Sequence, residues 1–384
     1  MNILDEIDDM KEKLIKDRRT LHQMPEIGFA LDQTCAYIKK RLTELGYTPH
    51  DIGDHGIYTT IGEGSPCLLL RADMDGLPIE EESGLPFAST NHHAHACGHD
   101  LHMTMLLGAC ALFKKMKKIN GTIKILFQPS EENASGAKAM IEAGILENPH
   151  VDAAFSMHIK ADQKTGTIHY RPGTLMASSD FFKVVIEGKS AHGSAPHEGI
   201  DPIAIAAHTI VNLEMISSRE INAKERFTMT FGKVEAGKAN NVIPDEATLE
   251  GSIRCFDPDV RVAVLERFED IISATCDMYN ANSRIDYPMR ALTVYNDPKM
   301  VDLLTPALKE IAEVDDHCEP LSISEDFSYY SEKVPSLFVL VGAQGDHEPI
   351  SLHNSAIVFN EAGMKTGISA FVQAALTYLK GSVL

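Results

Sequence analysis

The chain of 384 residues lacks any apolar run near the roughly 18 to 20 residues that a membrane-spanning helix needs. Its N-terminus, MNILDEIDDMKEKLIKDRR, is charged from the start and has no apolar core of a signal peptide. It also lacks an excess of basic residues, because 35 Lys and Arg stand against 55 Asp and Glu, for a net charge of −20. Phosphate and anionic lipid would be repelled. We therefore expect no nucleic-acid partner, no membrane partner and a cytoplasmic location.

A disulfide framework is also missing from the pattern, since the seven cysteines are scattered and odd in number. Most of them fit small buried hydrophobic positions, and only Cys97 stands among other metal-binding groups. The length exceeds what one ordinary core supports, so two domains are the expectation. Apolar residues at 44% and charged residues at 23% are ordinary for a globular protein.

The order of the expected helices and strands changes once along the chain. Helices are expected at 2–23, 33–45 and 99–118, and buried strands at 67–75, 122–132 and 152–158. From about residue 178 the strands alternate between apolar and polar residues. The order there, with strands at 180–188, 226–237 and 246–256 and helices at 201–218 and 259–279, is typical of a β-α-β-β-α-β unit. A helix at 298–313 and a buried strand at 335–343 then return to the first pattern.

These elements predict an α/β fold. Residues 1–177 and 292–384 are expected to form one domain with a mostly parallel, doubly wound sheet and helices on both faces. Residues 178–291 are expected to form an inserted ferredoxin-like α+β domain.

The segment HACGHDLH, residues 95–102, holds three histidines, one cysteine and one aspartate. Imidazole, thiolate and carboxylate all bind borderline-soft divalent metals. A surface histidine cluster or chance would also account for this segment alone, because an isolated Cys-x-His pair is a weak signal. The preceding NHH, residues 91–93, is better explained as a polar loop.

Further candidate ligands come after the expected strands, which is where sites gather in open α/β sheets. They are Asp73 and Asp75, Glu131 and Glu132, His158, and finally His347 and His353. Each has a plainer explanation by itself, as an exposed glutamate pair or a hydrogen-bonded core histidine. Their convergence on one sheet edge is what predicts a metal site.

Eight motifs follow one another along roughly residues 20–380: RADMDGLPI (71–79), HACGHDLHM (95–103), FQPSEE (127–132), MH (157–158), AHGSAPHEG (191–199), NVIPDEATLEGSIR (241–254), SEDFSYY (324–330) and SLHN (351–354). Together they resemble the amidohydrolase branch of the dinuclear-metal aminoacylase and carboxypeptidase family. That branch includes hippurate hydrolases, indole-acetyl-amino-acid hydrolases and N-acetyl-diaminopimelate deacetylases.

The resemblance implies two divalent metal ions, Mn²⁺ or Zn²⁺, with Co²⁺ or Ni²⁺ also possible. It implies five metal ligands, which are Cys97, His99, Glu132, His158 and His353. Cys97 would be shared between the two ions. Glu131 would act as general base, and Asp75 would orient a ligand.

For the inserted domain at 178–291, the resemblance implies a lid or dimerisation role in a homodimer, with the rest forming the catalytic domain. His192 would then donate a hydrogen bond to the reacting oxyanion, often in the partner subunit's site. Asn241 and Arg254 would help to hold the substrate, and Arg254 could grip its carboxylate with two hydrogen bonds. A loop histidine and an exposed strand charge remain the plainer alternatives for His192 and Arg254.

The resulting hypothesis is a metal-dependent amidohydrolase that cleaves N-acyl amino acids with metal-activated water. A bound dication lowers the pKa of water from about 15.7 toward about 7, and Glu131 can pass the released proton to the leaving amine. A dipeptidase or metallocarboxypeptidase acting on short peptides stays open, as does a non-catalytic metal- or peptide-binding protein. Glu131 favours catalysis, because binding alone needs no base beside a ligand. SEDFSYY receives no catalytic role.

Overall fold

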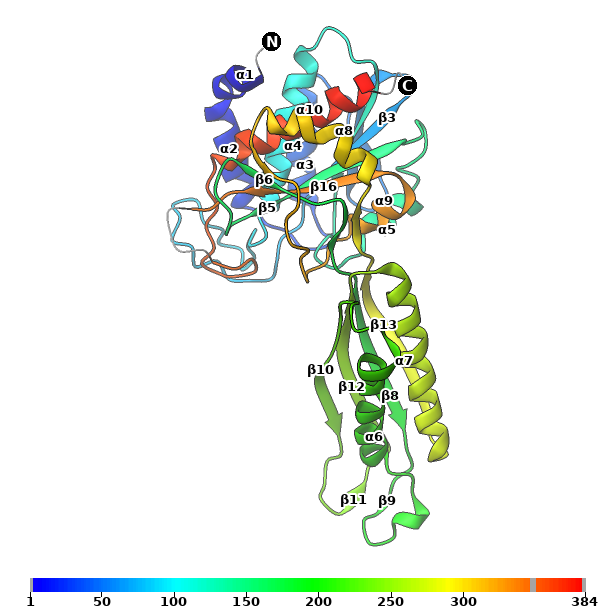
Figure 1. Ribbon diagram of the computed structural model, residues 1–384. Helices are drawn as coiled ribbons and strands as arrows, with labels where there is room; N and C mark the ends of the chain where they lie inside the picture. Colours follow the sequence, from blue (N-terminus) through cyan, green and yellow to red (C-terminus); the bar gives the residue numbers. More distant parts are fainter. Residues whose placement is uncertain (1–2, 346–349, 382–384) are drawn as a thin grey trace. The chain divides into compact units, whose positions relative to one another are not determined.

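The computed structural model describes residues 3–345 and 350–381, which divide into two compact units (Figure 1). The larger unit comprises residues 1–175, 294–320 and 325–384, as far as these are described. The inserted unit comprises residues 176–293 together with the short segment 321–324. The sequence pattern predicts that 321–324 belongs to the larger domain. This segment lies with the inserted unit because it hydrogen-bonds to Ala177 and Arg254.

An eight-stranded sheet forms the centre of the larger unit, in the order β1-β2-β4-β3-β5-β16-β6-β15. Its strands are β1 (His50–Ile52), β2 (Gly56–Glu63), β3 (Cys67–Asp73), β4 (Gly121–Gln128), β5 (Ala153–Lys160), β6 (Thr167–His169), β15 (Glu313–Asp315) and β16 (Ser336–Gly342). The four central strands β4, β3, β5 and β16 run parallel. The expected mostly parallel sheet is confirmed, although β1, β2, β6 and β15 have no counterpart among the strands expected from the sequence.

Helices cover both faces of this sheet: α1 (Ile3–Asp9), α2 (Lys11–His22), α3 (Asp32–Glu44), α4 (His99–Lys115), α5 (Gly136–Glu142), α8 (Pro298–Lys309), α9 (Ser328–Lys333) and α10 (Gly363–Gly381). Helices α4 and α10 pack together over β3 and β5, whereas α5 and α9 pack on β4 and β16. The helix expected over 2–23 is interrupted at Met10. Within 3–345 and 350–381, no helix is both long and apolar enough to cross a membrane.

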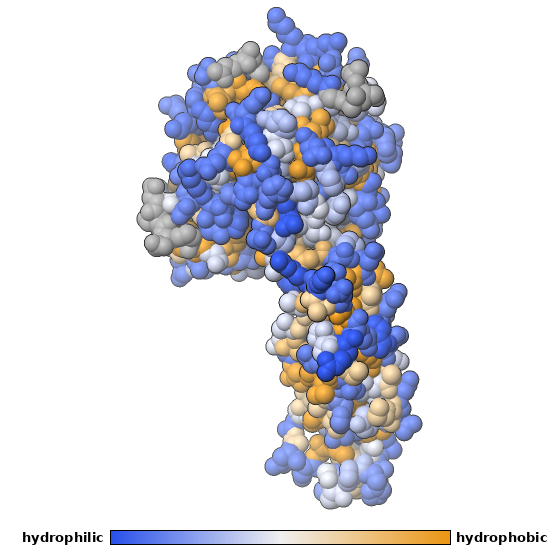
Figure 2. Space-filling view, in the orientation of Figure 1, coloured by the Kyte–Doolittle hydropathy of each residue, from blue (hydrophilic) through white to orange (hydrophobic). Residues whose placement is uncertain are grey.

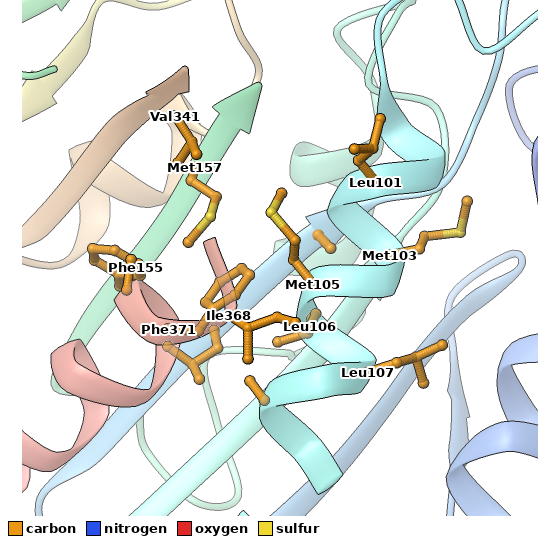
Figure 3. Close-up of a cluster of buried hydrophobic side chains, with 14 of the residues drawn as sticks. Leu101, Met103, Met105, Leu106, Leu107, Phe155, Met157, Val341, Ile368 and Phe371 are labelled. Atoms are coloured by element: carbon orange, nitrogen blue, oxygen red, sulfur yellow. The ribbon is translucent and has the colours of Figure 1, made fainter. Parts of the chain in front are cut away.

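Helix α4 is buried on almost every side, and Figure 3 shows how. Met105 points toward Met157 of β5 and Ile368 of α10, while Met103 and Leu107 point away on the other side of the helix. Each such side chain contributes about 1.5 to 3 kcal/mol by its burial. The core therefore fixes α4 in place, together with the segment that leads into its first turn.

The inserted unit is a four-stranded antiparallel sheet in the order β10-β12-β8-β13, with two helices on one face (Figure 1). Its elements are β8 (Ser179–Glu187), α6 (Pro202–Met215), β10 (Phe227–Ala236), β12 (Glu246–Cys255), α7 (Pro258–Met278) and β13 (Asn282–Ala291). A two-stranded ribbon of β9 (Ala191–His192) and β11 (Val242–Ile243) extends it. The four-stranded sheet with its two helices is the ferredoxin-like arrangement, and the predicted fold class is confirmed. A second ribbon, which pairs β7 (Gly173–Met176) with β14 (Val294–Asn296), belongs to the larger unit except for Met176.

Three helices begin in the same way, with an aspartate followed by a proline. The pairs are Asp201–Pro202 in α6, Asp257–Pro258 in α7 and Asp297–Pro298 in α8. Each aspartate side chain accepts two backbone N–H groups, and proline at the first helical position has no N–H to satisfy. The local sequence therefore fixes where these helices start.

Candidate active site

Side chains that can bind a metal meet at the carboxyl ends of the central strands of the larger unit. Three groups, each with ligand atoms within 4.8 Å of one another, share members: Cys97, His99 and His158; Cys97, Glu132 and His353; and His99, Glu131 and Glu132. The structure thus brings together all five ligands named from the sequence, with Glu131 beside them. His347 lies outside the described residues.

The distances inside this cluster are short. Cys97 Sγ lies 3.3 Å from His158 Nε2, and His353 Nε2 lies 3.3 Å from Glu132 Oε2. His99 Nε2 lies 3.8 Å from Glu132 Oε1 and 3.9 Å from Glu131 Oε2. A thiol, three imidazoles and two carboxyl groups therefore border one small space.

The buried histidines present the nitrogen that a metal needs. His99 Nδ1 donates to the Asp75 carbonyl at 2.8 Å, and His158 Nδ1 donates to the Ile159 carbonyl at 2.5 Å. In the neutral rings the lone pair is then on Nε2, which faces the cluster. His99 Nε2 and Glu132 Oε1 are buried and have no hydrogen-bond partner among the described residues. Such orphaned ligand atoms fit divalent cations, and Cys97 belongs to two of the groups.

Asp75 holds the ligand-bearing segments in place. Its Oδ1 accepts the Glu131 backbone N–H at 3.0 Å, and its Oδ2 accepts that of Glu132 at 3.2 Å. The turn around the two glutamates is strained, since Ser130 and Ala134 have φ of 57° and 51°. Such backbone persists only where its surroundings hold it. Asp75 supplies that restraint from its own buried position.

Gly98 allows the chain to pass from Cys97 into helix α4. Its φ of 83° lies in the left-handed region, which favours glycine. A Cβ at this position would lie 2.4 Å from Ile159 Cγ2 and 3.2 Å from Phe359 Cζ. The spacing of Cys97 and His99 around a turn this tight therefore requires glycine between them.

A fully buried arginine lies beside the carboxylates. Arg71 of β3 donates to Asp73 and Asp326 at 2.7 Å each and to Glu325 at 3.0 Å. A buried charge needs such partners, because its desolvation otherwise costs several kcal/mol. The sequence analysis missed this role for Arg71, Glu325 and Asp326. The available signal is a single arginine inside the apolar run CLLLRAD.

His102 belongs to the structural support of the site. Asp73, His99 and His102 also lie within 4.8 Å of one another. However, His102 Nδ1 donates to Asp73 Oδ1 at 2.6 Å, and His102 Nε2 accepts the Ile159 N–H at 2.8 Å. Both nitrogens are engaged, so His102 fixes the strand next to His158.

Burial dominates the electrostatics of the site. It raises the pKa of Glu131 well above the usual range, and the nearby Glu325 carboxylate raises it further. It also raises the pKa of the Cys97 thiol, and it raises the pKa of Glu132 to about 7. Burial lowers the pKa of His99, but the Asp73 carboxylate opposes this and the pKa is raised to about 10. A bound dication would reverse the effect on Cys97, because metal coordination deprotonates a thiol.

His192 and Asn241 lie side by side in the inserted unit. The strands β9 and β11 pair, and the Gly193 N–H donates to the Asn241 carbonyl at 2.8 Å. Both side chains are exposed. His192 Nδ1 accepts the Ser194 N–H at 3.1 Å. In the neutral ring the proton is therefore on Nε2, which leaves a hydrogen-bond donor at the exposed edge.

Arg254 lies elsewhere in the inserted unit. Its Nη1 donates to the Ser322 carbonyl at 3.1 Å, and its guanidinium carbon lies 5.8 Å from the centre of the Phe181 ring. It is near the end of β12, eight positions after Glu246, or about 26 Å along a strand that rises about 3.3 Å per residue. Within this unit, the structure does not bring Arg254 together with His192 and Asn241.

An α/β sheet that carries clustered metal ligands at its edge, with the buried carboxyl group of Glu131 beside them, is typical of metal-dependent hydrolases. The chain belongs to one family in that class, peptidase family M20/M25/M40, whose family model matches residues 69–377. The resemblance drawn from the eight motifs is thereby confirmed, as is the expectation of a metal-dependent hydrolase.

Similar proteins cover nearly the whole chain. It is 39% identical over 361 residues to N-acetyl-L-cysteine deacetylase of Bacillus subtilis (strain 168), covering 92% of this chain and 85% of that protein. It is 34% identical over 388 residues to hippurate hydrolase of Campylobacter jejuni, covering 99% and 100%. A solved Bacillus subtilis structure, YXEP, described as a dinuclear metal binding peptidase of the M20 family, matches with a TM-score of 0.83 at 33% identity, covering 97% and 99%.

Proposed function

We propose that the protein hydrolyses the amide bond of N-acyl amino acids. Two of its relatives are named for that chemistry, since N-acetylcysteine and hippurate are both N-acyl amino acids. The observation that carries the proposal is the position of Glu131. Its carboxyl group is buried beside the ligands, at 8% exposure, and a protein that only bound metal would not need it there.

In this proposal Cys97, His99, Glu132, His158 and His353 would hold two divalent cations, and Cys97 is the ligand that belongs to two of the three groups. When bound, the cations supply Lewis acidity that polarises the substrate carbonyl and lowers the pKa of water. Thiolate and imidazole suit Zn²⁺, and Mn²⁺ is the second candidate, with Co²⁺ and Ni²⁺ also compatible with the donors.

The protein's own groups would then move one proton. Glu131 accepts it from the attacking water and delivers it to the leaving nitrogen, a role in which general acid–base catalysis contributes about 10²- to 10⁴-fold. The raised pKa of Glu131, caused by burial, suits this exchange. His192 donates from Nε2 to the carbonyl oxygen as negative charge develops on it.

Asn241 and Arg254 are proposed to hold the substrate, with Arg254 gripping its carboxylate. The separation between Arg254 and the pair of His192 and Asn241 is too large for one small substrate to touch all three in the same inserted unit. This supports a homodimer in which His192 and Asn241 of one copy serve the site of the other. The inserted unit would then be the lid and dimerisation domain.

The outer face of α6 supports the proposed dimer. Ile203, Val211 and Met215 are 47%, 68% and 50% exposed, and Ala207 lies between them at helical spacing. Figure 2 shows apolar side chains on the surface of the inserted unit. Strand β10 is an edge of the same unit's sheet, so one row of its backbone groups has no strand partner among the described residues. A second copy of the chain would cover both features. We also propose a cytoplasmic location, because the seven cysteines are scattered and odd in number and suggest no disulfide framework.

A substrate panel tests the proposed function. Protein reconstituted with Zn²⁺, Mn²⁺ or Co²⁺ is offered N-acetyl and N-benzoyl amino acids beside free dipeptides and C-terminal peptide substrates, and released amine is measured. We expect the acyl amino acids to be hydrolysed fastest. Faster cleavage of peptides would favour the dipeptidase or carboxypeptidase alternative, and metal binding without turnover on any substrate would favour a binding protein.

Sedimentation velocity tests the dimer. A Val211→Asp variant should sediment as a monomer, because an aspartate would be buried without a partner in the interface. Glu214→Asp, on the same helix, is the matched control. A wild-type monomer at micromolar concentration would remove the dimer from the proposal.

A further inference from the structure

His353, one of the five proposed ligands, is the one least enclosed by the fold. Its side chain is 51% exposed, whereas Cys97, His99 and His158 are buried. Its φ of 63° lies in the left-handed region, which is strained for a histidine. Its Nε2 nevertheless lies 3.3 Å from Glu132 Oε2. Neighbouring groups must therefore hold this segment in its strained conformation.

Three hydrogen bonds tether the segment around His353. The His353 N–H donates to the Ala96 carbonyl at 3.1 Å, directly beside Cys97. The Glu82 N–H donates to the Ser355 carbonyl at 2.7 Å, and Ser355 Oγ donates to Glu82 Oε2 at 2.6 Å. Glu82 therefore holds Ser355 from both its backbone and its side chain, two residues after the ligand.

The residue before Glu82 is anchored in the interior. Glu81 Oε1 contacts His22 Nε2 at 2.9 Å, and Glu81 Oε2 accepts the Ser89 N–H at 2.6 Å. His22 Nδ1 in turn contacts Asp100 Oδ2 at 2.8 Å. Asp100 is fully buried and directly follows the ligand His99 in α4. A continuous series of contacts thus runs from the first turn of α4 to Glu81.

We propose that Glu81 and Glu82 form a brace that positions His353 for metal binding, with Glu81 anchored inward and Glu82 holding Ser355. Glu82 is then a positioning residue, which acts on the metal only through His353. The inference rests on the proposed two-metal site. It extends that site to a loop, residues 80–89, that carries none of the proposed ligands. Ligands held in place before binding lose less freedom on binding, which raises affinity.

Metal titration tests the brace with a readout independent of turnover. Co²⁺ is added to metal-free protein and its visible absorption is followed, for wild type, His353→Ala, Glu82→Ala and Ser355→Ala. We expect the weaker of two binding steps to weaken about tenfold in Glu82→Ala and somewhat less in Ser355→Ala. The stronger step and the thermal midpoint of unfolding should stay unchanged.

Two matched controls distinguish the effect of losing the brace from the effect of losing a negative charge. Glu80→Ala removes a glutamate from the same loop, where its exposed side chain contacts only His92 among the contacts described. Ser355→Thr retains the hydroxyl group. Both should titrate like wild type.

The outcomes distinguish the brace from the site it serves. If Glu82→Ala and Glu80→Ala titrate alike while His353→Ala loses the weaker step, the brace is wrong and the metal site stands. If His353→Ala binds Co²⁺ like wild type, the ligand assignment is wrong, and the brace fails with it. Should Glu82→Ala fail to fold, the difference between Ser355→Ala and Ser355→Thr decides the matter.

Discussion

The central strands of the larger unit and the edge strands of the inserted unit differ in how they hold polar groups. In the larger unit, β3 and β16 are buried along their whole length, and β3 still contains Arg71 and Asp73. In the inserted unit, most of β13 and the first six residues of β10 alternate between partly covered and exposed residues. Two of the three functional candidates there, His192 and Asn241, are exposed beside or within strands of two residues.

The difference shows how each unit can contribute to chemistry. Buried charges must be paired, so the groups around Arg71 and Asp75 are held in one arrangement before anything binds. Exposed groups on a short ribbon stay hydrated, so placing them there costs little free energy. Few contacts hold them in position. The larger unit thus supplies a preorganised centre, while His192 is proposed to supply a donor whose removal should leave the fold intact. Four experiments test this contrast.

The largest effect is expected for Glu131→Gln at the preorganised centre. Gln keeps the shape but cannot accept a proton, so kcat should fall by about 10⁴-fold, the upper end for a general base. Metal content, measured by elemental analysis of the reconstituted protein, should remain that of wild type. Glu132→Gln is the control and should lose metal. Loss of metal in Glu131→Gln, with metal retained in Glu132→Gln, would mean that the roles of the two glutamates are exchanged.

Arg71→Met should produce the largest loss of stability. Removing the cation leaves Asp73, Glu325 and Asp326 buried without their shared partner, which costs about 3 to 5 kcal/mol. The free energy of unfolding is measured in urea. Arg284→Met, an exposed arginine of the inserted unit, is the comparison and should change stability by about 0.5 kcal/mol or less. Similar losses in the two variants would erase the contrast between the sheets.

His192→Ala should reduce kcat by about 10²- to 10³-fold, the usual cost of one donor to a developing oxyanion. The thermal midpoint should not change, because the side chain is exposed and, among the residues that the structure describes, hydrogen-bonds only to Ser194. His197→Ala, in the same loop, should leave both quantities unaltered. Wild-type kcat in His192→Ala would leave the inserted unit without the proposed catalytic role.

The smallest effect is a pH dependence at His22. Burial lowers the pKa of His22, but Asp100 and Glu81 oppose this and leave it raised. Because the folded pKa exceeds the unfolded value of about 6.5, the stabilisation is full below that pH and is lost as pH rises through the folded pKa. The deficit of His22→Gln relative to wild type should therefore shrink in urea unfolding as the pH rises from about 6.5 through the folded pKa of His22. A constant deficit would show that His22 stays neutral.

Much of this molecule could be predicted from its sequence because the signals are local. The apolar run CLLLRAD indicates a buried strand, and the change to alternating strands near residue 178 marks the inserted unit. The sheet-edge rule placed Glu132 and His158 together although they belong to different strand ends. Family motifs supplied the roles, which spacing alone could not.

The missed features depend on contacts between distant parts of the chain. Arg71 and Asp326 are separated by 255 positions, and nothing near either residue indicates the other. The interruption at Met10 within the helix expected over 2–23 follows no glycine or proline. Ser130 and His353 adopt left-handed backbone without being glycine, so their turns have no compositional signature. The surrounding packing decides these features.

Gly98 has a practical consequence for anyone who wishes to retune the metal preference of this enzyme. Its neighbours Ile159 and Phe359 already fill the space that any side chain would occupy. Libraries that randomise residues 97–99 together would therefore consist mostly of misfolded protein. Exchanging Cys97 for another donor while residue 98 stays fixed is the design that leaves α4 and its first turn undisturbed.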